Sequence, residues 1–507
     1  MEHNLKIYNS LSRQKETFEP LHEGHVGMYV CGPTVYSDVH LGNCRTFVSF
    51  DVIYRYLMYL GYKVRYVRNI TDVGHLEGDT DSDAEDKISK KARLEQLEPM
   101  ELVQRHTRSF HHILGILNTL SPSIEPTATG HIVEQIQMVQ EILDNGYAYI
   151  KNGSVYFNTP KFIQDHGVYG KLSGKRVDDL LSETRDDLKN QDEKNDPSDF
   201  AIWIKADERH LMRWPSPWSV GFPGWHLECS AMSTKYLGKQ FDIHGGGMDL
   251  QFPHHENEIA QNYGACGCMP VRYWMHGNML LLNGRKMSKT PDPETGKSNS
   301  ITPVELFSGE NEIFSKAYSP MVVRFFMLQS HYRSTLDLTD DALLAAEKGF
   351  RRLMEANKVL QGMAYAGKGQ EGALGEELKK LIAQAHEEMN DDFNTPKALA
   401  VLFDLVTKAN SLKDGHLPID EVSPETFNLL KKTFQEFLYD IFGLKDEMEA
   451  GAEGNGITEG LMQLIIDIRQ QARANKDWGT SDKIRDALKE LDIVLKDSKE
   501  GTSWVKG

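Results

Sequence analysis

The chain has 507 residues, of which 40% are hydrophobic and 26% charged, which predicts roughly two to four soluble domains with ample cores. The net charge of −17 argues against a protein that coats nucleic acid indiscriminately, although a local basic face would still allow specific binding. Five cysteines, an odd number, do not make a disulfide framework. Because the sequence shows no signal peptide and no uninterrupted apolar stretch of ~18 residues, we expect a cytoplasmic protein without a membrane span.

The first predicted unit is a strand, a turn and a helix, followed by a second strand. The apolar run at 26–30 predicts a buried strand, and apolar side chains at helical spacing predict a helix over 46–60. Residues 63–67 predict the next strand, and this βαβ order is typical of a parallel sheet. The turn between them carries His40-Leu-Gly-Asn43, where free backbone N–H groups at a helix N-terminus could bind a phosphate.

The middle of the chain is predicted to leave this sheet and then return to it. Residues 147–225 predict an insertion that begins with a β-hairpin, whose turn is Lys151-Asn-Gly153. Within the insertion, the charge-rich run at 178–199 is typical of a solvated surface loop. The sheet is then expected to resume with a strand at 241–244, a glycine turn at 245–247, a helix near residue 254 and a strand at 273–276.

The remainder of the chain is predicted to be mostly helical. Beyond residue 301 the pattern is helical to about residue 444. Residues 445–456 are rich in glycine, alanine and acidic side chains, which predicts a linker. The last segment predicts two helices and two short strands, and its Trp478 and Trp504 could stack on unpaired bases.

Residues that could bind a metal ion fall in several separate segments. His254 and Glu258 are four apart, so on a helix they share a face and could hold one ion. A zinc protease motif is excluded, because the second histidine of HExxH would fall at Ile259. Two further ligands must come from elsewhere, and spacing does not choose among Cys31, Cys229 and the pair Cys266 and Cys268.

Two further segments have the residue types that nucleotides require. Lys286-Met-Ser-Lys289 lies in a turn-rich stretch, where two lysines on a mobile loop could stabilise a pyrophosphate leaving group. The glycines at 245–247 could let a ribose lie on the backbone, and Asp249 could accept hydrogen bonds from its hydroxyls. The Walker pattern is absent, so ATP would be held by another arrangement.

The order of these segments resembles the class I aminoacyl-tRNA synthetases, in which a HIGH-type motif follows the first strand and a KMSKS-type motif follows the last. Further segments are CGPTVY at 31–36, NITD at 69–72, GWHLECSAM at 224–232, DIHGGG at 242–247, FPHHENEIAQ at 252–261 and WMH at 274–276. They narrow the resemblance to the cysteinyl-tRNA synthetases, over about residues 5 to 504. This chain has asparagine at 43 where the general class motif has histidine, and Thr290 in place of the last serine of the lysine motif.

The resemblance implies a set of site residues, each carried over onto a matching position. The implied ligands of one zinc ion are Cys31, Cys229, His254 and Glu258. Gly32, Thr34, Thr71 and Trp225 would line the amino-acid pocket. ATP would be bound by His40, Gly42, Asn43, Gly245, Gly247, Asp249 and Lys289, and the implied catalytic residues are His40, Asn43, Lys286 and Lys289.

The resemblance also implies an activity and a domain order. L-cysteine would be activated by ATP with Mg²⁺ to cysteinyl-adenylate and transferred to the 3′-terminal adenosine of tRNA(Cys), by a protein expected to be a monomer. The implied fold is α/β, with a Rossmann-like parallel-sheet catalytic domain split by an insertion, then a helical bundle and a small mixed α/β unit. The expected domains are catalytic (1–146 and 226–300), connective insertion (147–225), stem-contact region (301–334), helical tRNA-binding bundle (335–445) and anticodon-binding unit (457–507).

Three alternatives remain open at this point. A related ligase joins cysteine to an amino sugar in mycothiol synthesis, but such enzymes lack the anticodon-reading tail that 457–507 predicts. A non-catalytic paralogue is disfavoured by the presence of both ATP motifs and all four implied metal positions. A zinc hydrolase is disfavoured by the missing second histidine.

Overall fold

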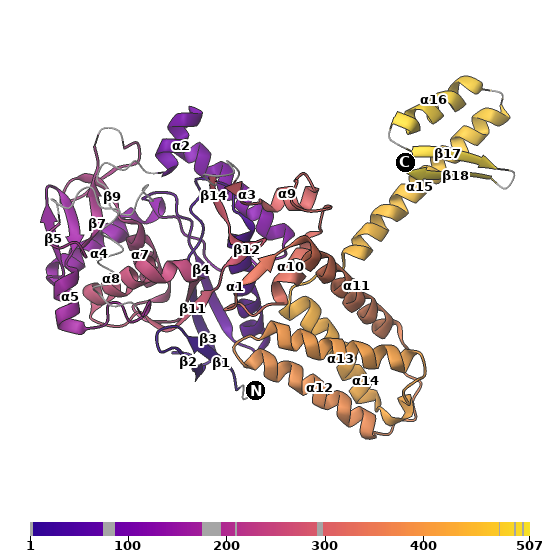
Figure 1. Cartoon of the computed structure of the whole chain (residues 1–507), viewed down its shortest axis with the longest axis horizontal. Helices are drawn as coiled ribbons and strands as arrows, with labels where there is room; N and C mark the ends of the chain where they lie inside the picture. The colour runs from indigo at the N-terminus through magenta and orange to yellow at the C-terminus, as the bar shows by residue number, and fades with distance from the viewer. Residues whose placement is uncertain are drawn as a thin grey trace. The chain divides into compact units, whose positions relative to one another are not determined.

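The computed structural model of the chain divides into two compact units, Met1–Leu444 and Lys445–Gly507 (Figure 1). The predicted surface loop at 178–199 lies mostly outside the described residues. The structure describes residues 4–74, 87–174, 194–207, 210–291, 298–475, 477–490, 493–498 and 501–506, and of these only the backbone at 288–291, 448–460, 474, 489–490, 493–498 and 501–506.

The first unit is built on a four-stranded parallel sheet, whose strand order is β11-β10-β3-β4. Its strands are β3 (His25–Val30), β4 (Lys63–Arg68), β10 (Phe241–Gly247) and β11 (Val271–Gly277). The predicted α/β class and its parallel sheet are confirmed. Strands β3 and β10 are neighbours, and the chain continues from β3 to β4 on one side and from β10 to β11 on the other. The carboxyl ends of β3 and β10 therefore mark the switch point, where open α/β sheets bind ligands.

Helix α1 (Leu41–Tyr59) joins β3 to β4 and begins earlier than the predicted residue 46. The reason is a reciprocal cap. The backbone N–H of Asn43 donates to the His40 ring at 3.4 Å, and the Asn43 side chain accepts from the backbone N–H of His40 at 3.2 Å. These bonds satisfy free N–H groups of the first turn. The predicted phosphate-binding segment is therefore the helix N-terminus itself.

The predicted glycine turn at 245–247 is wrong, because these residues extend β10 along β11. Gly245 pairs with Met275 and Gly247 with Gly277. A side chain does not fit here, since a Cβ on Gly245 would come within 2.2 Å of the Phe50 ring on α1. Glycine in this strand therefore permits the close packing of α1 on the sheet.

Between β4 and β10 the chain also forms a second layer, in which an antiparallel sheet of order β5-β6-β7-β9-β8 packs against helices (Figure 1). The predicted hairpin is confirmed, with Asn152 and Gly153 at φ 54° and 89°. The helices and strands between β4 and β10 are α2 (Lys87–Glu95), α3 (Pro99–Ile116), α4 (Ile132–Asp144), β5 (Ala148–Lys151), β6 (Ser154–Phe157), α5 (Thr159–His166), β7 (Phe200–Lys205), β8 (Trp214–Pro215), β9 (Val220–Pro223) and α7 (Trp225–Leu237). Helix α8 (Glu256–Cys266) follows β10 and contributes Ala260 to the same core.

After β11, a small sheet leads into a helical bundle. In the small sheet β12 (Leu280–Leu282) pairs with β13 (Arg285–Lys286) and with β16 (Leu336–Leu338). Buried leucines of the bundle continue the core of the parallel sheet and α1. The remaining elements of this unit are β1 (Lys6–Asn9), β2 (Gln14–Thr17), β14 (Ser288–Pro291), β15 (Ser298–Asn299), α9 (Pro303–Ser308), α10 (Pro320–Leu328), α11 (Asp340–Gly362), α12 (Ala373–Asn390), α13 (Thr395–Lys413) and α14 (Pro424–Gln435).

The second unit consists of α15 (Glu447–Ala474), α16 (Trp478–Glu490) and the antiparallel pair β17 (Ile493–Ser498) and β18 (Gly501–Lys506). The two helices and two strands expected from the sequence are confirmed. The predicted linker at 445–456 is wrong, because α15 begins at Glu447 and runs through it. Alanine and glutamate in that stretch favour a helix, and its glycines do not interrupt it.

A search of the described helices finds none that is both long enough and apolar enough to cross a membrane.

Candidate metal centre and adjoining cleft

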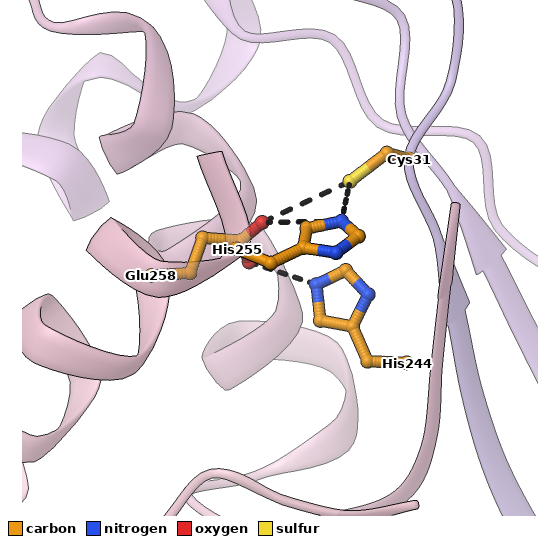
Figure 2. Close-up of side chains that lie close together, drawn as sticks. All are labelled: Cys31, His244, His255 and Glu258. Atoms are coloured by element: carbon orange, nitrogen blue, oxygen red, sulfur yellow. Dashed lines mark hydrogen bonds and ion pairs between the residues drawn. The ribbon is translucent and has the colours of Figure 1, made fainter. Parts of the chain in front are cut away.

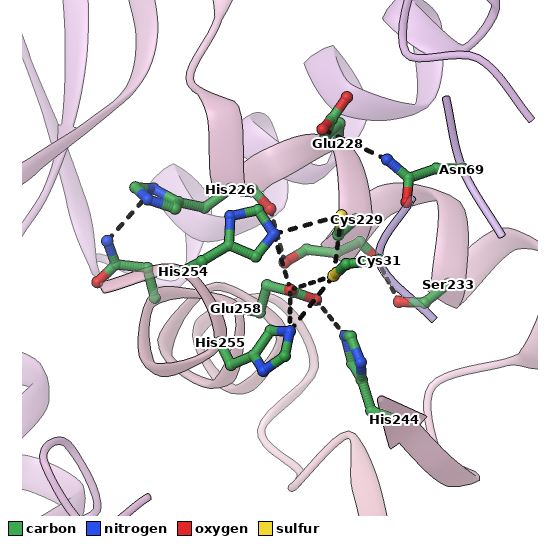
Figure 3. A network of polar contacts seen from close by, with 12 residues as sticks. Cys31, Asn69, His226, Glu228, Cys229, Ser233, His244, His254, His255 and Glu258 are labelled. Carbon is green, nitrogen blue, oxygen red and sulfur yellow. Dashed lines mark hydrogen bonds and ion pairs between the residues drawn. The ribbon is translucent and has the colours of Figure 1, made fainter. Parts of the chain in front are cut away.

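The two cysteines of the candidate centre come from different elements, and their side chains lie next to each other (Figure 3). Cys31 directly follows β3, and Cys229 lies on α7. Both are buried, and their sulfur atoms are 3.7 Å apart. The two cysteines therefore connect the end of β3 in the parallel sheet with helix α7.

His254 and Glu258 complete this group from a third segment. His254 lies in the short helical turn η4 (Gln251–His255), and Glu258 lies one turn later on α8. The His254 Nε2 atom is 3.2 Å from Glu258 Oε1 and 3.4 Å from Cys229 Sγ. Cys31 Sγ is 3.8 Å from the same Glu258 oxygen. All four side chains are at most 6% exposed.

These separations are those of a tetrahedral zinc site. Zinc bonds of ~2.3 Å to sulfur and ~2.0–2.1 Å to nitrogen or oxygen place tetrahedral ligand atoms roughly 3.3–3.8 Å apart. Four of the six distances among Cys31, Cys229, His254 and Glu258 run from 3.2 to 3.8 Å. The donor set and its spacing therefore fit one zinc ion.

A second group of four ligand atoms shares two of these residues (Figure 2). It consists of Cys31, His244, His255 and Glu258, all buried. His244 Nε2 is 2.8 Å from Glu258 Oε2, which is a hydrogen-bond distance and shorter than two ligands of one ion allow. His255 lies 4.0 Å from the other Glu258 oxygen. The first group fits the metal better, and His244 is placed to orient the Glu258 carboxylate.

The four residues shift one another's pKa values strongly. Burial acts to raise the pKa of Cys31, but its hydrogen bond with Cys229 and the nearby His254 and His244 lower it to about 6. Burial acts to lower the pKa of His254, but Cys31 raises it to about 10. Burial acts to raise the pKa of Glu258, but His244 and His254 lower it to about 2. Burial and Cys31 raise the pKa of Cys229 well above its usual range.

A cavity of about 450 Å³ opens beside this cluster. A second cavity of about 150 Å³ adjoins it and shares several of its residues. The predicted site residues that line the first cavity are Cys31, Gly32, Thr34, His40, Asn43, Trp225, Gly247 and Asp249. Those that line the second are His40, Gly42, Asn43, Gly247, Asp249 and Lys286. The structure thus brings the His-Leu-Gly-Asn segment, the glycine strand and the first motif lysine to one cleft.

Three predicted residues lie elsewhere. Gly245 is buried within β10, against Phe50. Thr71 is buried and pairs through its backbone with Thr34, and its hydroxyl donates to Glu228. Lys289 is on β14, and its side chain lies outside the described part of the structure.

Three family patterns together cover most of the chain. One described as tRNA synthetases class I (C) catalytic domain matches residues 17–348, a DALR domain matches 385–445, and a cysteinyl-tRNA ligase anticodon binding domain matches 463–504. The cysteine–tRNA ligase of Bacteroides thetaiotaomicron is 54% identical over 505 residues, and that of Porphyromonas gingivalis 52% over 504, each covering 99% of both chains. The chain belongs to the cysteinyl-tRNA synthetase family.

A solved structure of a more distant synthetase shares the fold. The methionyl-tRNA synthetase of Mycobacterium tuberculosis bound to methionyl-adenylate aligns with a TM-score of 0.54 at 13% identity. The alignment covers 82% of this chain and 89% of that one. At this identity the likeness supports the class I synthetase fold alone.

Several buried polar residues of this cysteinyl-tRNA synthetase family member were not singled out from its sequence. His244 lies within β10 and His276 near the end of β11, both in segments that carry the family resemblance, which was an available signal. His255 Nδ1 is 2.8 Å from His276 Nε2, and its other nitrogen is 3.3 Å from Cys31 Sγ. Glu228 accepts from Thr71, and its second oxygen has no hydrogen-bond partner among the described residues. Burial raises the pKa of Glu228 well above its usual range.

Arg45 is a second kind of residue that sequence reasoning missed. It lies on α1, is 2% exposed, and donates to the carbonyls of Met279 at 2.5 Å and Asn278 at 3.1 Å. The same guanidinium donates to the carbonyls of His331 and Ser334, at 3.2 and 2.5 Å. Asn278 and Met279 line the second cavity and directly precede β12. Arg45 therefore fixes α1 to the base of the hairpin that β12 forms with β13, which carries Lys286 and is called the lysine-motif hairpin below.

Proposed function

We propose that the chain ligates L-cysteine to tRNA(Cys), using ATP to form cysteinyl-adenylate as the intermediate. One observation carries this proposal most directly: Cys31 of the metal cluster and His40 of the ATP motif line the same cavity. A cysteine substrate whose thiol is held at the metal cluster beside Cys31 would present its carboxylate toward ATP phosphates held beside His40. This is the relation that adenylate formation requires.

The proposed metal ion is zinc, held by Cys31, Cys229, His254 and Glu258. When bound, zinc would accept the substrate thiolate as an added ligand, which the hydroxyl of serine cannot match because it stays protonated at neutral pH. Such a site discriminates by bonding chemistry instead of by the size of an apolar pocket, so no editing domain is needed.

The amino-acid pocket is proposed to consist of Gly32, Thr34, Thr71 and Trp225 beside the metal. The Trp225 ring lies 4.5 Å, between centroids, from the His254 ring, so the indole covers one side of the cluster. Asn69 connects two of the pocket residues: its amide donates to the Thr71 hydroxyl at 3.1 Å, and its oxygen accepts from the Gly32 N–H at 2.8 Å. The polar floor of the pocket is thereby fixed before substrate arrives.

The nucleotide is proposed to lie along the two adjoining cavities. His40 and Asn43 would contact the ATP phosphates at the N-terminus of α1, with Gly42 permitting close approach. Asp249 and the glycine strand, Gly245 and Gly247, would hold the ribose. The lysines at 286 and 289 would stabilise the departing Mg²⁺-bound pyrophosphate. Activation is an in-line phosphoryl transfer dominated by positioning and charge, so no protein base is assigned to it.

The remainder of the chain is proposed to bind the tRNA. The divisions are those expected from the sequence, with 301–334 contacting the acceptor stem, 335–445 supporting the tRNA and 457–507 reading the anticodon. The matches to a DALR domain and to an anticodon binding domain support the last two. The exposed Trp478, at the start of α16, is available to stack on a base. We further propose that the protein is a cytoplasmic monomer.

The experiment that tests this function is aminoacylation with purified components. The full chain with zinc, ATP, Mg²⁺ and L-cysteine is expected to charge tRNA(Cys) and to release AMP and pyrophosphate. A reaction that forms the adenylate but transfers cysteine to an amino sugar and not to tRNA would establish the mycothiol-type ligase instead. That alternative is not favoured, because the anticodon binding domain pattern matches residues 463–504.

A further inference from the structure

A pair of cysteines at the end of α8 has no part in the proposed function. Cys266 is the last residue of α8, and Gly267 ends the helix in the left-handed conformation with φ 71°. This reversal places the side chains of Cys266 and Cys268 together, with their sulfur atoms 2.6 Å apart. A disulfide between them requires the two sulfur atoms to approach from 2.6 Å to about 2.05 Å.

These two cysteines differ from the other three in their exposure. Cys31, Cys44 and Cys229 are buried, whereas Cys266 and Cys268 are both half-buried. Neither belongs to the groups of metal-ligating side chains found among the described residues, so the sequence-level alternative that they bind the metal is not supported. Cys266 lies eight positions after Glu258 on α8, which is roughly 12 Å along the helix axis.

The surroundings of the pair favour stepwise thiol chemistry. Burial and the side chain of Cys266 raise the pKa of Cys268 to about 11. Cys268 also donates toward the backbone oxygen of Lys239 at 3.9 Å. In the contact between the two sulfur atoms either thiol can donate to the other. Because a thiolate and not a thiol attacks, the raised pKa of Cys268 disfavours it as the first nucleophile, and the first attack falls to Cys266.

We propose that Cys266 and Cys268 form a reversible intramolecular disulfide by exchange with a low-molecular-weight disulfide such as oxidised glutathione. In the first step the Cys266 thiolate attacks one sulfur of the small disulfide, whose S–S bond breaks and releases one thiolate. In the second, Cys268 loses its proton to solvent and attacks the Cys266 sulfur, releasing the other half. The protein gives up two electrons and two protons, and the small disulfide is reduced to two thiols.

This site is distinct from the metal centre and reacts before it. Attack by an external disulfide needs access to a sulfur atom, and Cys31 and Cys229 are only 6% and 1% exposed, whereas Cys266 and Cys268 are half-buried. Closure of the ring involves only the connection between α8 and β11, so the zinc ligands stay in place. The pair is thus a modification site on the surface of the catalytic unit.

The test uses the zinc-loaded full chain, oxidised glutathione and mass spectrometry after alkylation. For the unmodified chain we expect the peptide spanning 266–268 to lose two hydrogens, with no glutathione attached and zinc retained. Cys266→Ser and Cys268→Ser each lack the second thiol, so each should retain one glutathione that dithiothreitol removes. Cys44→Ser, which changes a buried cysteine, should behave as the unmodified chain.

Three outcomes would overturn the proposal. One is stable glutathione on Cys266 or Cys268 of the unmodified chain. Another is a pair that stays reduced under conditions that modify the single variants. The third is loss of zinc with oxidation of Cys31 and Cys229 before any change at 266–268.

Discussion

Cys31 and His40 line one cavity: Cys31 directly follows strand β3, and His40 caps helix α1, which comes next in the chain. Cys31 belongs to the cluster that fits zinc, and His40 to the helix N-terminus that fits phosphate. The turn between them therefore relates the site of amino-acid selection to the site of activation. In this arrangement, changes at either end should affect different substrates.

The first prediction concerns Cys229. Because Cys229→Ser removes one thiolate from the cluster, we expect loss of zinc from the purified protein and a large rise in the KM for cysteine. The KM for ATP should change little. Zinc content by elemental analysis and steady-state exchange kinetics measure these effects. Cys266→Ser is the matched control, and full zinc occupancy in Cys229→Ser would show that the ligand set is wrong.

The second prediction is a pH dependence of zinc binding. At pH 7 the raised pKa values of Cys229 and His254 leave both groups protonated, whereas Cys31, with a pKa of about 6, and Glu258, with a pKa of about 2, are mostly ionised. Zinc must then displace about two protons, so its affinity should fall by up to roughly 100-fold for each unit that the pH decreases near 7. Competition with a chelator across pH 6.5–8 measures this slope, and a pH-independent affinity would contradict it.

The third prediction concerns Arg45. Arg45→Lys keeps the charge but loses several hydrogen bonds to the carbonyls of Asn278, Met279, His331 and Ser334. We expect kcat/KM for ATP to fall roughly 10- to 100-fold, because the base of the lysine-motif hairpin loses its position. The KM for cysteine and the zinc content should not change, which distinguishes positioning from general destabilisation. Arg65→Lys, at an exposed site, should leave all three values unchanged, and equal effects on ATP and cysteine would refute this role.

The fourth prediction concerns stability. Asp51 is buried and accepts from Arg55 at 2.8 Å and from Arg324 at 2.5 Å. Asp51→Asn leaves two buried guanidinium groups without a carboxylate, which should cost about 3–5 kcal/mol of unfolding free energy. The pair Lys15 and Asp391 is about one-third exposed, so Lys15→Met should cost less than about 1 kcal/mol. Urea unfolding compares the two variants, and similar midpoints would contradict the assignment.

Much of the architecture could be predicted because it depends on local patterns. The parallel strands, the hairpin turn at Asn152 and Gly153 and the terminal unit follow from periodicity and turn chemistry. The Gly245–Gly247 error arose because glycine in a strand has the same sequence signal as a turn. Only the packing of Phe50 against β10 distinguishes the two.

The site was predictable in its motifs but not in its supporting residues. Spacing placed His254 and Glu258 together, whereas the choice of Cys31 and Cys229 came from the family resemblance. The roles of Arg45 and His244 depend on contacts between segments far apart in the sequence, such as Arg45 with Ser334. No local pattern carries that information.

The measurement that tests the central claim most directly is amino-acid-dependent exchange of pyrophosphate into ATP by the zinc-loaded chain. We predict exchange with cysteine and a kcat/KM at least about 10⁴-fold lower with serine, with most of the cysteine activity lost on removal of zinc. Equal exchange with serine would contradict selection by the Cys31–Cys229–His254–Glu258 centre. The absence of exchange with cysteine would contradict the activation reaction itself.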